Sequence, residues 1–215
     1  MIKSRIALLF ILLICLGLGA GSALAGTIGP SCGSCEGGVY TLTYSNFNTI
    51  GPNDQLDVSL NFNTATYTGG GLYIDAAAVK IAPSLISAVL IGAPASLPNG
   101  SVWNTFDGAL NANGCSGAGS GFVCTESTGD GAAVSNLNNT FTWRITILSG
   151  TLLSGQDAAS IKGLYNDAQG NKMGAVLSEN TTLNPDDTQV PEPGTMLMLG
   201  GGFAALALLR RRLKH

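Results

Sequence analysis

Residues 141–147 read Phe-Thr-Trp-Arg-Ile-Thr-Ile, and this stretch decides the fold class. Apolar and polar side chains alternate in it, which sends the two kinds to opposite faces of a β-strand. Residues 39–44 and 56–62 alternate in the same way. Since no comparable stretch keeps a helical period, we expect a chain built from strands, with Trp143 in the core.

The rest of the segment between residues 26 and 189 shows weaker strand signals. Further short strands are expected at 71–81, 85–91, 120–125, 158–166 and 172–179. Turn signals rich in glycine and asparagine separate them. Two sheets can each bury one face and leave a Thr- and Asn-rich face in water. The sequence therefore predicts one all-β domain, an antiparallel β-sandwich of jelly-roll or immunoglobulin-like type, over residues 26–189.

The charge of this segment excludes several functions. Residues 26–190 contain four Lys and Arg against twelve Asp and Glu. A net-negative surface cannot supply the phosphate contacts on which nucleic-acid affinity depends, so we expect no nucleic-acid partner. The chain has a single histidine, His215, its last residue. Mechanisms that need an imidazole base or a histidine metal ligand inside the folded region are therefore excluded, and we expect neither a metal nor a cofactor.

Residues 1–25 have the three parts of an export signal in order. A positive start with Lys3 and Arg5 precedes the apolar run 6–18, and Ala23-Leu24-Ala25 forms a small-x-small cleavage site before Gly26. A membrane-spanning helix is the alternative, but thirteen apolar residues followed by Gly19 and Gly21 make a poor span. We expect a signal helix that the export machinery recognises and that is removed next to Ala23, Ala25 and Gly26.

Export leaves four cysteines in an oxidising compartment, which indicates up to two disulfides. Among the three possible pairings, Cys115 with Cys124 is favoured because the two flank a short glycine-rich loop. Cys32 and Cys35 are then left to pair with each other or to stay free. Their C-x-x-C spacing is also a redox or zinc signature, but no second C-x-x-C or histidine ligand accompanies it. Residues 26–38 are expected to be a loose leader.

No catalytic constellation stands out in the sequence, so we expect a protein that is not an enzyme. Trp103, in a stretch bounded by Asn and Gly, could contact a glycan as a stacking platform, or it could anchor a loop. Asp54 with Asp57, Asp130, and Asp186 with Asp187 could hold Ca²⁺, although solvated turns are the default for such positions. A carboxylate-dependent glycosidase is the hydrolase chemistry that remains possible without histidine.

The segment 190–215 reads VPEPGTMLMLGGGFAALALLRRRLKH. Pro191 and Pro193 keep Glu192 and its neighbours extended, because each proline fixes φ and removes an N–H group. The run 195–209 is uncharged and is expected to form a short transmembrane helix. Arg210, Arg211 and Arg212 begin the basic tail 210–215, which should stop transfer and remain cytoplasmic.

This three-part tail resembles the PEP-CTERM sorting signal of exported proteins in Gram-negative bacteria. Pro191-Glu192-Pro193, the following Gly194, the short Gly-rich apolar helix and the arginine cluster match that signal as they stand. The resemblance implies an exosortase, a membrane-embedded cysteine transpeptidase, as partner, and an association with envelope exopolysaccharide. The middle of the chain looks like one of the variable domains that such proteins carry. This likeness suggests a β-sandwich of unassigned activity and transfers no catalytic residue.

Together these observations predict an exported protein that is first tethered in the inner membrane by its C-terminal helix. After processing it should reach the cell surface or the extracellular matrix, where it serves a structural or adhesive role. A carbohydrate-binding module that contacts exopolysaccharide is the main alternative, and the glycosidase is a third.

Overall fold

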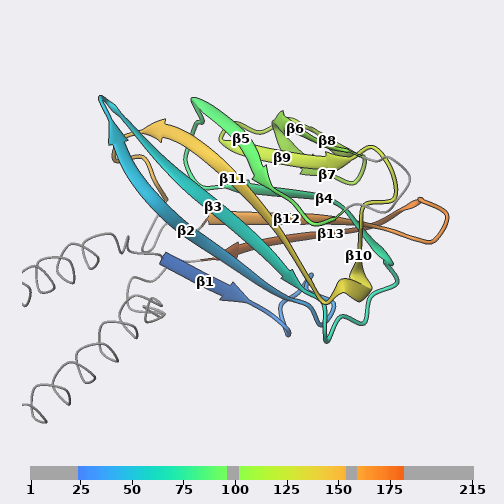
Figure 1. The fold of residues 1–215 in the computed structure, drawn as a ribbon. Helices are drawn as coiled ribbons and strands as arrows, with labels where there is room; N and C mark the ends of the chain where they lie inside the picture. Colours follow the sequence, from blue (N-terminus) through green and yellow to red (C-terminus); the bar gives the residue numbers. More distant parts are fainter. Residues whose placement is uncertain (1–23, 96–101, 154–158, 182–215) are drawn as a thin grey trace, which may run out of the picture. The chain divides into compact units, whose positions relative to one another are not determined.

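The computed structural model of the chain describes residues 24–95, 102–153 and 159–181 (Figure 1). All of them lie within one compact unit of residues 23–188. Apart from one short turn of 3₁₀-helix, η1 (Val134–Asn136), its regular elements are β-strands. All the strand pairs are antiparallel, so the predicted all-β, antiparallel class is confirmed.

The first sheet has five strands. In spatial order they are β1 (Leu24–Ile28), β2 (Val39–Ile50), β3 (Asn53–Asn63), β11 (Asn138–Leu148) and β5 (Ser87–Gly92). The pairing of β3 with β11 runs over eleven residues without a bulge. A common strand has about five or six residues, so the β3–β11 pair is unusually long and regular.

The second sheet lies against the first. Its main part is a row of five hydrogen-bonded strands. In spatial order they are β13 (Lys172–Thr181), β12 (Ala159–Asn166), β4 (Tyr73–Lys80), β9 (Phe122–Ser127) and β6 (Trp103–Asp107). The two-residue strand β10 (Ala132–Ala133) pairs with the start of β4. A separate hairpin of β7 (Ala109–Asn111) and β8 (Gly114–Gly117) completes the fold.

The inner faces of both sheets meet in one apolar core, to which period-two alternation directs every second side chain. Trp143 of β11 is fully buried there, as predicted, and its indole N–H donates to Thr125 Oγ1 of β9 at 2.7 Å. The hydroxyl groups of Tyr40 and Tyr165 share a hydrogen bond of 2.8 Å between β2 and β12. These polar contacts fix the two sheets to each other inside the core.

Residues 26–38 are not a loose leader, so that expectation was wrong. Residues 24–28 form β1, which pairs along β2 at one edge of the first sheet. Cys35 is fully buried, and its carbonyl accepts a hydrogen bond from the Tyr40 hydroxyl. Ser34 donates to Glu179 Oε1 of β13 through its N–H at 2.9 Å and through its hydroxyl at 2.6 Å. The segment therefore joins an edge of one sheet to an edge of the other.

Each of the eight predicted strands overlaps an observed one, while β1, β6, β7, β8 and β10 were not predicted. The signal helix and the transmembrane helix expected at 195–209 lie outside the described residues. Within the part of the chain that the structure describes, no helix has the length and apolar character needed to cross a membrane.

Candidate functional site

Two disulfides staple the β domain. Cys115 of β8 is joined to Cys124 of β9, with 5.6 Å between their Cα atoms, so the predicted pairing is confirmed. Cys32 and Cys35 are joined to each other, with Cα atoms 5.1 Å apart. The Cys115–Cys124 bond holds the β7–β8 hairpin over the outer face of the second sheet, where Leu110 packs into a small apolar cluster of its own.

An ion network fastens the same hairpin. The Lys172 ammonium lies 2.6 Å from Glu126 Oε1 and 3.6 Å from Asp75 Oδ2, and it donates to the Asn113 carbonyl at 2.6 Å. The other oxygen of Glu126 accepts the backbone N–H of Cys115 at 2.9 Å. Since Lys172 is on β13 and Glu126 on β9, the network links the hairpin to strands on both sides of β4.

Asp75 is the most perturbed acid of the described chain. Burial raises the pKa of its carboxyl group to about 6, although the nearby Lys172 ammonium acts in the opposite direction. Two buried side-chain oxygens, Asp75 Oδ2 and Asn166 Oδ1, lie in this region, and Asp75 Oδ2 forms an ion pair with Lys172. A glycosidase needs its two carboxyl groups to flank a space for substrate. Here the Lys172 ammonium group contacts the carboxyl groups of both Asp75 and Glu126.

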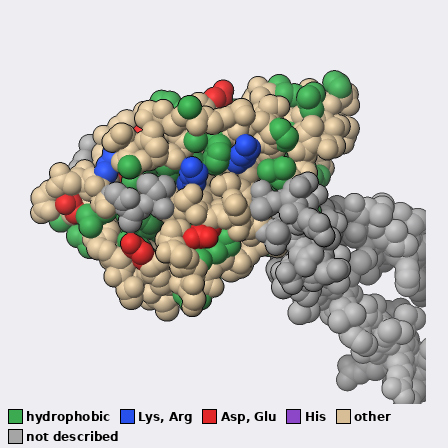
Figure 2. All heavy atoms as spheres, turned by 180° about the vertical axis from the view of Figure 1, so that it is seen from behind, with side chains coloured by type: hydrophobic (Ala, Val, Ile, Leu, Met, Phe, Trp, Pro, Cys, Tyr) green, Lys and Arg blue, Asp and Glu red, His purple; other side chains and the backbone are tan. Residues whose placement is uncertain are grey.

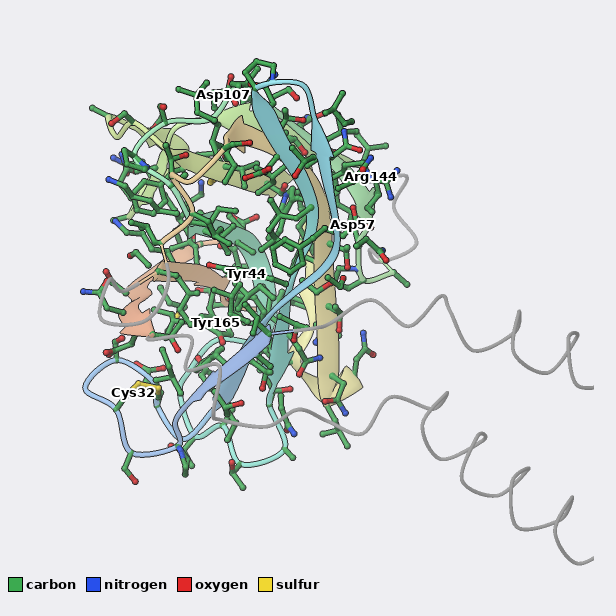
Figure 3. The ribbon with its side chains drawn as sticks, turned by 90° about the vertical axis from the view of Figure 1, so that its left-hand side faces the viewer. Cys32, Tyr44, Asp57, Asp107, Arg144 and Tyr165 are labelled. Carbon is green, nitrogen blue, oxygen red and sulfur yellow. A yellow bond between two sulfur atoms is a disulfide. The ribbon has the colours of Figure 1, made fainter. Side chains whose placement is uncertain are left out.

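The outer face of the first sheet is the second polar site. Its centre is an ion pair in which Arg144 of β11 donates Nε to Asp57 Oδ1 at 2.8 Å and Nη2 to Asp57 Oδ2 at 3.0 Å. Figure 3 shows the two labelled side chains next to each other on the outer side of the ribbon. The hydrogen bond from Arg144 holds the pKa of Asp57 below its usual value, and the bond from Asn46 acts in the same direction, while burial opposes both.

Uncharged side chains surround this ion pair. Hydroxyl and amide groups on adjacent strands bond to one another across the sheet, Thr27 with Thr41 at 3.1 Å, Ser59 with Thr142 at 2.9 Å, and Asn61 with Thr140 at 2.8 Å. The opposite side of the molecule is different. Figure 2, which shows the molecule from behind, has basic and acidic side chains spread over its surface. Lys80 and Lys162 belong to that second sheet and lie over the ring of Phe122.

Trp103 is placed on β6, half-buried against the core. Its indole N–H donates to the Pro94 carbonyl at 3.0 Å, and its ring stands perpendicular to that of Phe141 with centroids 4.9 Å apart. These two contacts are those expected of a side chain that anchors β6 at the edge of the second sheet. A glycan contact at Trp103 stays a prediction.

Most of the predicted processing residues lie outside the described part of the chain. These are Ala23 of the signal, Pro191, Glu192, Pro193 and Gly194 of the sorting motif, and Arg210, Arg211 and Arg212. Ala25 and Gly26 lie in β1, opposite Thr43 and Leu42. Signal cleavage between them would therefore leave the last three residues of β1 in place.

The sequence did not point to the Asp75, Glu126 and Lys172 network or to the Asp57–Arg144 pair. Asp57 and Arg144 do occupy polar positions of strongly alternating strands, which is a usable signal for an outward face. Only the register of β3 against β11 brings them directly opposite each other. Within the described ranges, no group of three or more His, Cys, Asp or Glu side chains is arranged to hold a metal ion.

Comparison with known proteins gives one match, and it covers the tail. The family model of the PEP-CTERM protein-sorting motif matches residues 189–212, which include the Pro-Glu-Pro stretch and the arginine cluster. Neither a curated protein nor a solved structure matches the chain. The chain therefore carries a PEP-CTERM protein-sorting motif, as its sequence predicted, and this motif implies an exported protein that exosortase-type machinery processes.

Proposed function

We propose that this protein serves a structural or adhesive, non-enzymatic role in the extracellular matrix once its tail has been processed. The PEP-CTERM motif at residues 189–212 is the observation on which the proposal depends, because it directs the β domain to the envelope. The finer architecture that we assign to the domain is a β-sandwich, supported by two antiparallel sheets whose inner faces share one core.

The construction of the domain supports such a role. Two disulfides and an ion network fasten its loops and its hairpin to the sheets. Disulfides limit the unfolded state and suit proteins that must persist outside the cell. The most perturbed acid, Asp75, lies buried within the network that holds the hairpin. Its burial and its contact with Lys172 support a structural role for Asp75 in this proposal.

The test is fractionation of cells that make the full chain. We expect the protein in the surface and matrix fractions, with an intact mass that lacks the signal peptide and the residues after the cleaved motif. The same mass, measured before and after reduction, should differ by the hydrogens of two disulfides. Cells without the protein should form a less cohesive matrix. Retention of the whole chain in the cytoplasm, or an unchanged matrix, would contradict the proposal.

A second candidate function is a carbohydrate-binding module that contacts exopolysaccharide. It is favoured by the outer face of the first sheet, where paired hydroxyl and amide groups outnumber charges. Binding and structure are compatible here, since a matrix protein that holds polysaccharide is also an adhesive one.

A further inference from the structure

The outer face of the first sheet consists of aligned rows that cross its strands. One row contains Thr27, Thr41, Asn61 and Thr140, the next contains Thr43, Ser59 and Thr142, and a third contains Ser45, Asp57 and Arg144. Neighbouring strands lie about 4.8 Å apart, and successive rows about 7 Å apart, from the geometry of β-sheets. These rows therefore present aligned hydrogen-bonding groups, and on β5 the exposed Val89 continues the third row next to Arg144.

Hydrogen bonds within the rows fix these groups in advance. Ser59 shares a hydrogen bond with Thr142, and Asn61 donates to Thr140. A hydroxyl group has one donor and two acceptor positions, so each pairing leaves capacity for a further partner. Because the rotamers are already restrained, a ligand that bonds to these groups loses less side-chain entropy on binding.

The charge on this face decides the kind of ligand. In these rows Asp57 and Arg144 are the charged members, and they neutralise each other. An anionic or cationic polymer would find no net opposite charge there. An uncharged polyhydroxyl chain can exchange hydrogen bonds with the face without stripping water from isolated charges, which is the costly step in burying polar surfaces.

We propose that this outer face binds a neutral polysaccharide through its rows of Thr, Ser and Asn side chains. The inference rests on the proposed matrix function and names the partner. No aromatic side chain stands in these described rows, so the stacking that usually strengthens sugar binding is missing from them. Each sugar unit is therefore held weakly, and affinity grows with the number of units that engage the rows at once. The face binds long polymers and discriminates against short oligosaccharides.

The experiment measures depletion of the detergent-solubilised full chain from solution by insoluble polymers. The probes are cellulose, chitin, β-1,3-glucan and mannan as neutral polymers, with alginate beads as the polyanion. The test variant combines Thr43→Val, Ser59→Ala and Thr142→Val, which remove the hydroxyl groups of the middle row. The matched control combines Ser160→Ala with Ser178→Ala on the second sheet. A single change at an exposed position, Thr140→Arg, covers the case in which the triple variant does not fold.

We expect retention by at least one neutral polymer and little by alginate. The triple variant and Thr140→Arg should each bind about tenfold more weakly or worse, while the control should stay within about twofold of the unchanged chain. A soluble hexasaccharide of the same polymer should compete poorly. Retention by no neutral polymer, preference for alginate, or binding by both face variants that equals that of the unchanged chain overturns the inference. If the protein still reaches the matrix in that case, the proposed structural role stands without this partner.

Discussion

Arg144 and Asp57 face each other directly across the β11–β3 pair and are joined by two hydrogen bonds of 2.8 and 3.0 Å. Asp57 is almost completely buried, whereas about half of the Arg144 side chain is exposed. The guanidinium group thus covers the carboxylate and keeps it paired at the centre of an otherwise uncharged face. Asn46 adds a third hydrogen bond to the carboxylate at 2.7 Å.

This pairing predicts how stability depends on acid. The pKa of Asp57 is lowered from its usual 3.8 in the folded state, so its stabilising effect is complete above that value and is lost as the pH falls below it. Arg144→Gln should therefore lower the free energy of unfolding at pH 7, and the difference from the unchanged chain should shrink below about pH 4. Urea unfolding measured from pH 2.5 to 7 gives both quantities.

The control for this prediction is Lys80→Gln, which removes a basic side chain that lies over the ring of Phe122 on the second sheet. Its effect on the free energy of unfolding should not follow the titration of a carboxylate. If Arg144→Gln and Lys80→Gln change with pH in the same way, the Asp57 pairing does not stabilise the fold.

Asp75 should give the opposite pH dependence. Burial raises the pKa of its carboxyl group from 3.8 to about 6 in the folded state. Between those two values the folded chain holds more protons than the unfolded chain, so the free energy of unfolding falls as the pH rises from about 4 to about 6. Asp75→Asn should remove this contribution, and the slope measured by urea unfolding over that interval should become flatter or turn upward. An identical slope in both chains would show that Asp75 titrates normally.

The Cys115–Cys124 bond should stabilise the domain by limiting the unfolded chain. For a loop of about ten residues the chain-entropy model gives about 2.7 kcal/mol. Replacing both cysteines with alanine should lower the free energy of unfolding by an amount of this order, measured in denaturant. A non-reduced peptide map of the unchanged protein supplies the independent check, because it should contain the Cys115–Cys124 and Cys32–Cys35 pairs. Free thiols at these positions would refute the pairing.

The strand pattern was predictable where one face is buried and the other is wet. Phe141, Trp143 and Ile145 alternate with polar residues because they fill the core from a strand whose other face meets water. β6 escaped prediction because its side chains are half-buried or exposed and do not alternate strongly. β1 escaped it because the same residues carry the small side chains of a cleavage site.

The polar networks were harder to predict than the strands, because tertiary structure brings their residues together. Asp75 lies at a position where the register of β12 against β4 shifts, so no periodic rule specifies which way its side chain points. Glu126 and Lys172 are far apart in the sequence, and they meet because β9 and β13 lie in the same sheet. The Cys115–Cys124 pairing could be predicted because its loop is local. The docking of Ser34 on Glu179 could not, since 145 residues separate them.

Substitution of Trp103 distinguishes its two possible roles, a structural anchor of β6 and a stacking platform for a glycan. If it anchors the edge of the second sheet through Phe141 and Pro94, Trp103→Ala should lower the thermal midpoint by several degrees, as expected for a lost core contact of a few kcal/mol. Retention on the neutral polymers should then follow only the folded fraction. If retention is lost while the thermal midpoint is unchanged, Trp103 is a glycan contact instead. Val102→Ala, an exposed neighbour, is the matched control.

The last prediction concerns the sorting motif, which the family model places at residues 189–212. From the sequence, Pro191 and Pro193 are expected to favour an extended Pro-Glu-Pro segment that a processing enzyme can reach. A helix over 195–209, as the sequence predicts, would rise only about 22 Å, less than the thickness of the membrane core, but the arginine cluster should not readily follow the domain across the membrane. Replacing Pro191, Glu192 and Pro193 with alanine should therefore trap uncleaved precursor in the membrane, visible as a larger intact mass.

Deleting residues 210–214 provides the complementary change, because it removes the charges that stop transfer and leaves the Pro-Glu-Pro segment intact. We expect weaker retention in the membrane before cleavage, and therefore more full-length chain in the medium. Mass spectrometry of the membrane and medium fractions separates the two effects. The alanine variant should remain uncleaved in the membrane, whereas the deletion variant should escape from the membrane before cleavage. A mature surface form that still contains a peptide spanning residues 195–210 would show that the tail acts only as an anchor.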